Sequence, residues 1–256
     1  MAVVLTCTNQ KGGVAKTTTN WAVADCLRKR GYKTLMVDLD PQSNLTLIAG
    51  ADSDGRTIKD VFDKTCSVEE AIVTTEGQGD ILPSTLLLAS ADNTYNSPGR
   101  EYMLSIALNK VKDRYDFILV DTPPSIGVLV FNALTAADHV IVPIATDVFS
   151  FVALEQLSQT LQAIVDATNP HLSTLGIVIT NYVGRSNHDK NHVQVVRDSE
   201  ELLNARSFDT LIRYGSVVRE AELMREPLSS YAPRSKQAAD YEALTDEILG
   251  RINNDQ

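Results

Sequence analysis

Cysteine is scarce in the sequence, and long apolar runs are absent from it. The 256 residues include three cysteines, Cys7, Cys26 and Cys66, an odd number without CxxC spacing. This pattern argues against a disulfide framework and against a cysteine-rich zinc site. No stretch of about 20 apolar residues predicts a membrane-spanning helix, and the first residues lack a basic leader and a small-residue cleavage site. We therefore expect a protein of a reducing compartment, the cytoplasm.

Glycine and proline are also few, and basic residues are outnumbered by acidic ones. With 13 Gly, 9 Pro, 43% hydrophobic and 22% charged residues, the composition excludes collagen-like, low-complexity and largely disordered chains. The 23 Lys and Arg residues face 33 Asp and Glu residues, which gives a net charge of -10. The overall field thus does not attract nucleic acid or anionic membranes, so binding of either kind requires a local basic patch.

Short apolar runs rich in β-branched residues alternate with helix-length segments. The runs have the composition of buried strands and cover residues 3–8, 34–39, 117–120, 139–144 and 175–180. This succession predicts an α/β fold with a doubly wound, mostly parallel sheet and helices on both faces. No repeat or linker interrupts it, so we expect a single domain over residues 1–256, with ligands at the carboxyl ends of the strands.

A glycine-rich loop follows the first predicted strand and precedes a helix predicted over residues 17–30. Glycines allow the backbone N–H groups to face phosphate oxygens, and the helix N-terminus adds a partial positive charge. Lys16 is expected on the β and γ phosphates, and the Thr17 hydroxyl on Mg²⁺. A turn that only joins strand to helix is the alternative. The predicted nucleotide-binding loop consists of Lys11, Gly12, Gly13, Val14, Ala15, Lys16, Thr17 and Thr18.

Aspartates follow two other predicted strands. Asp121 ends the strand at 117–120 and is expected to hold Mg²⁺ through water, as a Walker B aspartate does. Asp38 and Asp40 share one face by the period of two, so we expect Asp38 near the metal and Asp40 beyond it, where it orients the attacking water. One such aspartate is more often a cap or turn residue. Three at matching strand ends favour a metal site.

Three motifs occur in a fixed order, namely KGGVAKTT at residues 11–18, DLDPQSN at 38–44 and DTPP at 121–124, and YAPRS at 231–235 precedes a last predicted helix. In these motifs the sequence resembles the ParA/MinD group of deviant Walker-type P-loop ATPases, most closely the short ParA-type partition ATPases, over essentially the whole chain. The resemblance implies a P-loop NTPase fold with a deviant Walker A motif and Mg²⁺-dependent hydrolysis of ATP. Ala15 stands where the family more often has Gly, and we expect it to be tolerated if its φ is negative.

The resemblance also implies roles for single residues. Lys11 would be the signature lysine that reaches the nucleotide of a second subunit, so that Lys11, Lys16 and Asp40 together form the catalytic set of an ATP-dependent homodimer. Asn181 would contribute to the adenine pocket, which the segment Arg213-Tyr214 would close. A turn residue that ends its strand is an equally good interpretation of Asn181.

Basic residues gather in one part of the chain. Residues 185–236 hold nine basic and eight acidic side chains, whereas the rest holds 14 basic and 25 acidic ones. The resemblance implies non-specific DNA binding by phosphate neutralisation; Arg185 matches a family position implicated in DNA contact, and Arg219 lies near another. Each could instead be a solvated surface arginine. A ParB-like adaptor and a nucleoid-associated location are also implied, whereas the cargo (plasmid, chromosome or protein organelle) is not.

Two further functions share the same phosphate loop. A MinD-like, membrane-associated positioning ATPase would need a basic C-terminal helix, but residues 240–256 carry five acidic side chains and only Arg251 as a basic one. Membrane association is therefore not expected. A metabolic enzyme similar to dethiobiotin synthetase, an ATP-dependent ligase, is the other alternative, and it would turn over ATP only with a small-molecule substrate.

Overall fold

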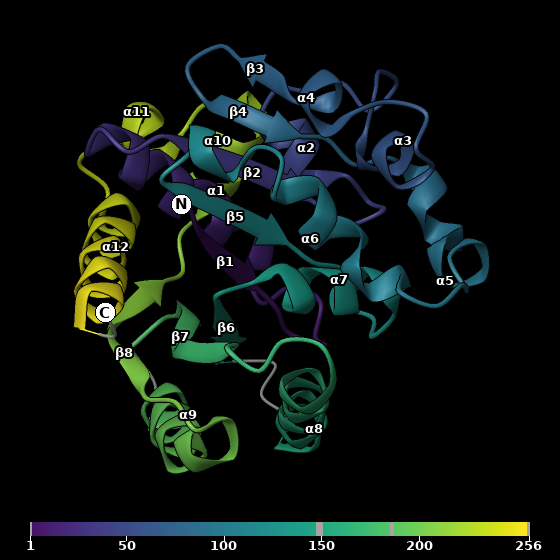
Figure 1. Cartoon of the computed structure of the whole chain (residues 1–256). Helices are drawn as coiled ribbons and strands as arrows, with labels where there is room; N and C mark the ends of the chain where they lie inside the picture. The colour runs from purple at the N-terminus through teal and green to yellow at the C-terminus, as the bar shows by residue number, and fades with distance from the viewer. Residues whose placement is uncertain (1, 147–150, 185–186, 255–256) are drawn as a thin grey trace.

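The computed structural model describes residues 2–146, 151–184 and 187–254, with the backbone alone for 187–190. Eight strands form one sheet in the order β3-β4-β2-β5-β1-β6-β7-β8 (Figure 1). All neighbouring strands are parallel except β3 and β4. The strands are β1 Val3–Cys7, β2 Thr34–Asp38, β3 Val73–Thr75, β4 Gly79–Leu82, β5 Phe117–Asp121, β6 His139–Ala145, β7 Ser173–Tyr182 and β8 Ser207–Arg213.

Helices cover both faces of this sheet, which confirms the predicted doubly wound α/β fold. The α-helices are α1 Lys16–Lys29, α2 Asn44–Ile48, α3 Ile58–Phe62, α4 Val68–Ala71, α5 Ala91–Thr94, α6 Met103–Leu108, α7 Val128–Ala136, α8 Phe151–Ala167, α9 Asn187–Asp198, α10 Ser216–Met224, α11 Leu228–Tyr231 and α12 Lys236–Asn254. Short 3-10 helices are η1 Leu86–Ser90, η2 Arg100–Tyr102, η3 Lys112–Arg114 and η4 Glu200–Leu203.

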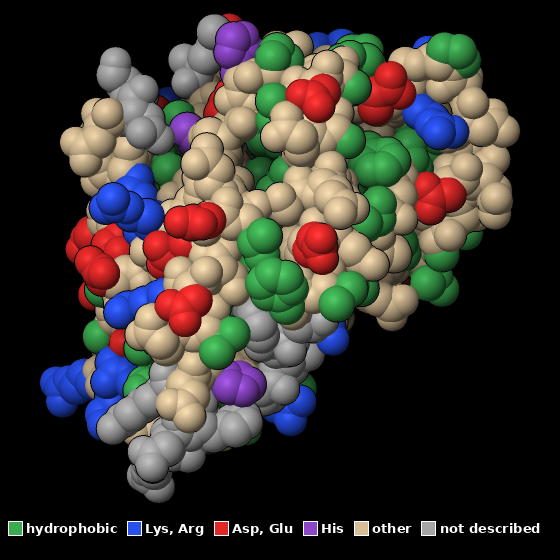
Figure 2. Space-filling view, turned by 90° about the horizontal axis from the view of Figure 1, so that it is seen from below, with side chains coloured by type: hydrophobic (Ala, Val, Ile, Leu, Met, Phe, Trp, Pro, Cys, Tyr) green, Lys and Arg blue, Asp and Glu red, His purple; other side chains and the backbone are tan. Residues whose placement is uncertain are grey.

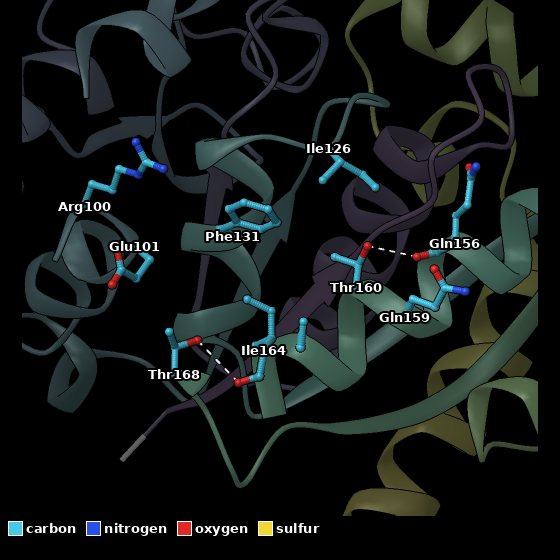
Figure 3. A pocket seen from close by; sticks show the side chains of 10 residues that line it. Arg100, Glu101, Ile126, Phe131, Gln156, Gln159, Thr160, Ile164 and Thr168 are labelled. Atoms are coloured by element: carbon cyan, nitrogen blue, oxygen red, sulfur yellow. Dashed lines mark hydrogen bonds between the residues drawn. The ribbon is translucent and has the colours of Figure 1, made fainter. Parts of the chain in front are cut away.

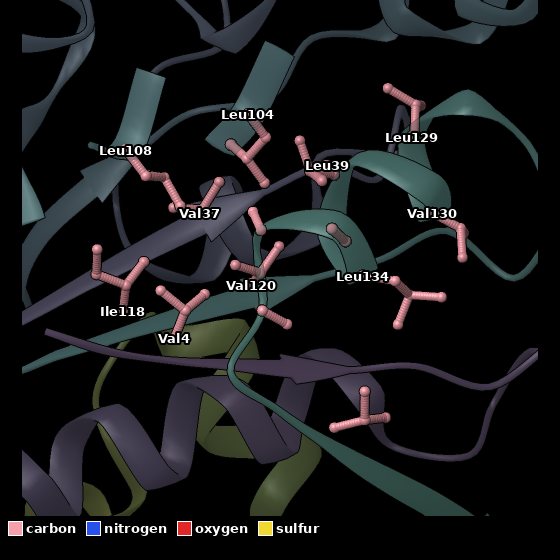
Figure 4. Packing of buried hydrophobic residues seen from close by; sticks show 14 of the residues in the cluster. Val4, Val37, Leu39, Leu104, Leu108, Ile118, Val120, Leu129, Val130 and Leu134 are labelled. Carbon is pink, nitrogen blue, oxygen red and sulfur yellow. The ribbon is translucent and has the colours of Figure 1, made fainter. Parts of the chain in front are cut away.

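Each central strand sends alternate side chains into two separate hydrophobic clusters. On β5, Val120 packs with α6 and α7 on one face (Figure 4), whereas Leu119 packs with α1 and α12 on the other. All five residues of β5 are buried for this reason. A strand that is covered on both faces has no polar alternation, which is why a continuous apolar run identified it.

The five predicted strands are present, with small differences at their ends, and α1 ends where the sequence indicates. Arg30 caps α1 and Gly31 follows with φ 89°, the left-handed conformation that glycine adopts most easily. Three strands, β3, β4 and β8, were not predicted from the sequence. β3 and β4 are only three and four residues long, and β8 is an edge strand with half-exposed residues such as Thr210 and Leu211. Short or edge strands lack the apolar run on which the prediction depended.

Candidate nucleotide-binding site

The loops after β1, β2 and β5 meet at one edge of the sheet, because β5 lies between β2 and β1 and all three strands are parallel. A cavity of about 740 Å³ opens there. Its walls come from the phosphate loop, from Asp40 and α2, and from the chain between β8 and α10. Of the predicted site residues it is lined by Gly12, Gly13, Val14, Ala15, Lys16, Thr17, Thr18, Asp40, Asn181, Arg213 and Arg219.

The phosphate loop takes a left-handed turn at two places. Gly13 has φ 76° and Ala15 has φ 64°. Ala15 is expected to be tolerated if its φ is negative, and this condition is not met. A Cβ in the left-handed region costs about 1–2 kcal/mol, so Ala15 is held in a strained backbone conformation.

Lys16 lies at the centre of this loop. Its Nζ donates hydrogen bonds to the carbonyl oxygens of Asn9, at 3.0 Å, and Lys11, at 2.9 Å. Burial lowers the pKa of Lys16, while the charges of Asp121 and Asp40 act in the opposite direction. The ammonium group is thus held by the loop backbone beside two carboxylates, where an anionic phosphate would be attracted.

Thr17 and Asp121 are joined directly. The Thr17 hydroxyl donates to Asp121 Oδ2 at 2.6 Å, and Asn20 Nδ2 donates to Asp121 Oδ1 at 3.1 Å. Burial raises the pKa of Asp121 to about 6, against the Thr17 hydrogen bond and the Lys16 charge, which lower it. Hydroxyl and carboxylate oxygens are the hard ligands that Mg²⁺ takes, directly or through water, so this pair fits the ion.

Asp38 lies in more enclosed surroundings than the sequence predicts. It is fully buried and does not line the cavity. One of its oxygens accepts from Thr46 N, at 2.8 Å, and Thr46 Oγ1, at 2.7 Å, and the other accepts from Asp40 N at 3.0 Å. Burial first, and then the charge of Asp121, raise the pKa of Asp38 to about 8, although the Thr46 hydrogen bonds oppose this. The contacts of Asp38 are those of a group that positions Asp40 and α2, and its role as a metal ligand stays a prediction.

Asp40 reaches the cavity, as expected. Its carboxylate accepts from Gln42 N at 2.9 Å, and its carbonyl oxygen accepts from Ser84 Oγ at 2.7 Å. These bonds fix the loop that follows β2 on both sides of Asp40. The side chain is only 8% exposed, so it faces the cavity from a defined position rather than from a free loop.

Two polar contacts at the site were missed by sequence reasoning. Glu222 on α10 accepts from Thr18 Oγ1 at 2.6 Å and joins α10 to the first turn of α1. Asp240 on α12, counted only as a C-terminal acid, is buried and pairs with Arg213. Both partners are far apart in sequence from the residues they bind, so local patterns gave no signal for either.

The candidate adenine residues, Asn181 and Arg213, both line the cavity. Asn181, with φ 55°, donates from Nδ2 to the Gly13 carbonyl oxygen at 3.3 Å. The Arg213 guanidinium donates from Nε to Asp240 Oδ2 at 2.9 Å and from NH2 to the Lys236 carbonyl at 3.1 Å. Because these bonds engage its side chain, this segment can offer a base its backbone and the exposed ring of Tyr214.

Three predicted residues remain: Lys11 and the two arginines expected to bind DNA. Lys11 is half-buried beside the cavity without lining it, and its backbone N–H donates to Asn9 Oδ1 at 3.0 Å. Arg219, predicted to bind DNA, is exposed on α10 and lines the nucleotide cavity itself. Arg185 lies outside the described residues. The DNA-binding patch of Arg185 and Arg219 therefore stays a prediction.

A second cavity, of about 680 Å³, lies between η2, α7 and α8 (Figure 3). Its lining includes the apolar side chains of Ile126, Phe131 and Ile164 and polar ones from η2 and α8. It contains none of the predicted site residues. Within the part of the chain that the structure describes, no cluster of three or more His, Cys, Asp or Glu side chains suits a metal ion, and no helix has the length and apolarity needed to cross a membrane.

Known proteins with similar sequences and structures include nucleotide-binding ATPases. The sequence model of the AAA domain family matches residues 2–174. The chain is 33% identical to the sporulation initiation inhibitor protein Soj of Bacillus subtilis, covering 97% of this chain and 98% of Soj. It is 34% identical to the chromosome-partitioning ATPase Soj of Treponema pallidum, covering 98% of both. Cobyrinic acid a,c-diamide synthase of Mycobacterium smegmatis, crystallised with ADP and magnesium, superposes with a TM-score of 0.88 at 32% identity, covering 100% of this chain and 97% of that one.

A parallel sheet with a lysine- and threonine-bearing phosphate loop after its central strand defines a P-loop nucleotide hydrolase. Together with the matches above, it shows that the chain belongs to the ParA/MinD family of P-loop ATPases. It is an ATPase, and its cofactors are ATP and Mg²⁺.

Proposed function

We propose that the protein is a partition ATPase that forms a homodimer with ATP, binds DNA without sequence preference and positions DNA or another cytoplasmic cargo on the nucleoid with a ParB-like adaptor. The observation that carries this proposal is the full-length similarity to the Soj proteins, one of which is named a chromosome-partitioning ATPase. The motifs of that family come together at the carboxyl edge of a single sheet. We further propose that residues 1–256 fold as one domain.

The residues at the nucleotide cavity have different roles in ATP hydrolysis. Lys16 neutralises the β and γ phosphates, and Thr17 with Asp121 holds Mg²⁺, which spreads the negative charge of the phosphates when bound. Asp40, fixed on both sides by hydrogen bonds, orients the attacking water. Lys11, which does not line the cleft of its own chain, supplies a second positive charge to the cleft of a partner subunit, as an arginine finger does.

Dimerisation is tested by Gly12→Val. Gly12 has no atom within 4 Å of the place where a Cβ would be added, so the Cβ of a larger side chain causes no clash within its own chain. We expect the variant to fold but to remain monomeric in light scattering with ATPγS and Mg²⁺, whereas the wild type dimerises. Gly55→Val, in an equally open loop position, is the matched control and should dimerise. A Gly12→Val protein that still dimerises would contradict the proposed interface.

DNA binding is expected to depend on ATP and to weaken steeply with salt, because it rests on phosphate contacts. On the face shown in Figure 2, Lys and Arg side chains are scattered among Asp and Glu side chains. A dimer, which doubles the number of phosphate contacts, is therefore the better binder. The double variant Arg185→Glu with Arg219→Glu should lose DNA affinity at low salt. Since Arg219 lines the nucleotide cavity, MgADP affinity must be measured beside it. Unchanged DNA affinity would show that the patch is misplaced.

A small-molecule ligase is the second candidate, favoured by the similarity to cobyrinic acid a,c-diamide synthase. Phosphate release distinguishes the two functions. A partition ATPase should be stimulated by DNA and by an adaptor encoded in a neighbouring reading frame. A ligase should remain unresponsive to both and hydrolyse ATP only with a small-molecule acceptor.

A further inference from the structure

Gln78 lies in the turn between β3 and β4 and is buried, with 3% of its surface exposed. Its Oε1 accepts a hydrogen bond from the indole Nε1 of Trp21 on α1. Its Nε2 donates to two carbonyl oxygens, that of Ile48 at the end of α2, at 2.9 Å, and that of Arg225 directly after α10, at 2.8 Å. An indole N–H can only donate and a carbonyl can only accept, so the partners fix the orientation of the amide.

The three elements that meet at Gln78 are walls of the nucleotide cavity. α1 begins with the phosphate loop, α2 contributes Asn44 and Ile48, and α10 contributes Val218, Arg219 and Glu222. Gln78 itself does not line the cavity. It therefore connects the three elements that form the cavity without lining the space where a nucleotide would bind.

Among the hydrogen bonds of the described residues, no other one links α2 to α10. α10 is joined to α1 by Glu222 and Thr18, but α2 and α10 share a polar partner only in Gln78. Arg225, at the end of α10, has φ 53°, so the carbonyl that Gln78 binds belongs to a helix end held in a strained conformation.

We propose that Gln78 is a positioning residue for nucleotide binding, which sets the separation of α2 and α10 and so the width of the cavity. The inference rests on the nucleotide site proposed above. Without the amide, a buried indole N–H and two carbonyls lose their partners, and only the apolar packing of α2 against α10 is left to set the separation of the two helices. A nucleotide must then bring them together, which weakens binding. Neither Lys16 nor Asp40 is hydrogen-bonded to Gln78, so turnover of bound ATP is retained.

The test uses Gln78→Met, which keeps the side-chain length and removes the polar atoms. We expect the Kd for MgADP in calorimetry, and the KM for ATP, to rise about tenfold, equivalent to about 1.4 kcal/mol, with kcat within about threefold of the wild type. Trp21 is the single tryptophan of the chain. Its emission should respond to MgADP in the wild type and no longer do so in Gln78→Met.

Asn169→Leu is the matched control. Asn169 Nδ2 also donates to two carbonyl oxygens, those of Leu134 at 2.9 Å and Ala137 at 2.6 Å, but beside the start of β6, away from the nucleotide cavity. This variant should lower Tm and leave the Kd for MgADP unchanged. Gln78→Glu, which still accepts from Trp21 but turns a second oxygen toward two carbonyls, should weaken MgADP binding more than Gln78→Met.

Three results would overturn the inference. One is a Gln78→Met protein with wild-type MgADP affinity, whatever its Tm. Another is an equal loss of affinity in Asn169→Leu, because the effect would then follow stability alone. If neither Gln78 variant folds, unchanged Trp21 emission on MgADP binding to the wild type contradicts the link. A wild type that binds MgADP at another site, with Lys16→Ala unaffected, would instead refute the proposed site.

Discussion

Asp38 and Asp121 lie opposite each other in the register of β2 and β5, both fully buried. Each carries a raised pKa, about 8 for Asp38 and about 6 for Asp121, and burial is the largest cause in both. The charge of Asp121 also raises the pKa of Asp38. The two acids thus lie at neighbouring, buried strand ends, where the ionisation of one disfavours the ionisation of the other.

The first prediction concerns pH and Mg²⁺. Because the folded-state pKa of both acids lies above the ordinary aspartate value, the folded protein binds more protons than the unfolded chain from about pH 4 to about pH 8. The pair should therefore lower the free energy of unfolding as pH rises through that window. Mg²⁺ should restore more stability at pH 8 than at pH 6, because it favours the ionised carboxylates. Urea unfolding at several pH values measures both effects.

Asp38→Asn is the control for this pH dependence. Its unfolding free energy should start lower, because the amide NH₂ must face a donor, either Asp40 N or Thr46. Because the amide cannot ionise, the unfolding free energy should fall less steeply with pH. A slope as steep as that of the wild type would exclude Asp38 as its source.

The second prediction separates nucleotide binding from turnover. Lys16→Ala removes the ammonium held at the centre of the phosphate loop, and it should weaken ATP binding by 10-fold or more, since hydrogen bonds to charged groups contribute about 1.5–3 kcal/mol. Calorimetry with MgADP and with MgATPγS measures the loss. Binding equal to that of the wild type would remove Lys16 from the site.

The third prediction concerns Asp40. Asp40→Ala should bind ATP with near wild-type affinity and hydrolyse it about 100-fold more slowly or worse, because general-base and water-orienting groups typically contribute that much. The variant should persist as an ATP-bound dimer. Single-turnover phosphate release checks this, and rapid release would show that another group orients the water.

The fourth prediction is that Ala15→Gly stabilises the protein. Ala15 has φ 64°, so removing its Cβ relieves strain of about 1–2 kcal/mol, less the extra entropy that glycine gives the unfolded chain. We expect a net gain of about 0.5–1 kcal/mol in urea unfolding. Ala243→Gly, on an exposed helical position of α12, is the control and should cost about 1 kcal/mol. Losses of the same size in both would contradict the strain.

The fifth prediction concerns Gly176 in β7. A Cβ there would lie 2.3 Å from Arg251 NH1 and 2.7 Å from the Phe208 ring. That guanidinium lies over Phe208, 4.0 Å from its centroid, and binds the Leu175 carbonyl at 2.7 Å. Gly176→Ala should therefore lower the free energy of unfolding by about 1–3 kcal/mol. Gly250→Ala, in α12 with no atom within 4 Å, should raise it by about 0.5–1 kcal/mol.

The sequence by itself determined the central strands and the phosphate loop. Val120 and its neighbours form a continuous apolar run because β5 is covered on both faces, and such a run can be recognised locally. Lys16 and Thr17 lie within the same loop, so their proximity required no knowledge of the fold. Parallel strand order also placed Asp121 beside them, since strand ends of a parallel sheet share one edge.

Only the tertiary structure decided what the other polar groups do. Asp38 and Asp40 look alike in the sequence, yet one is enclosed by Thr46 and the other faces the cavity. Gln78 has no local pattern that distinguishes it from a turn residue. Its partners on α1, α2 and α10 are brought together by long-range packing, and hydrogen bonds between such distant residues leave no periodic trace in the sequence.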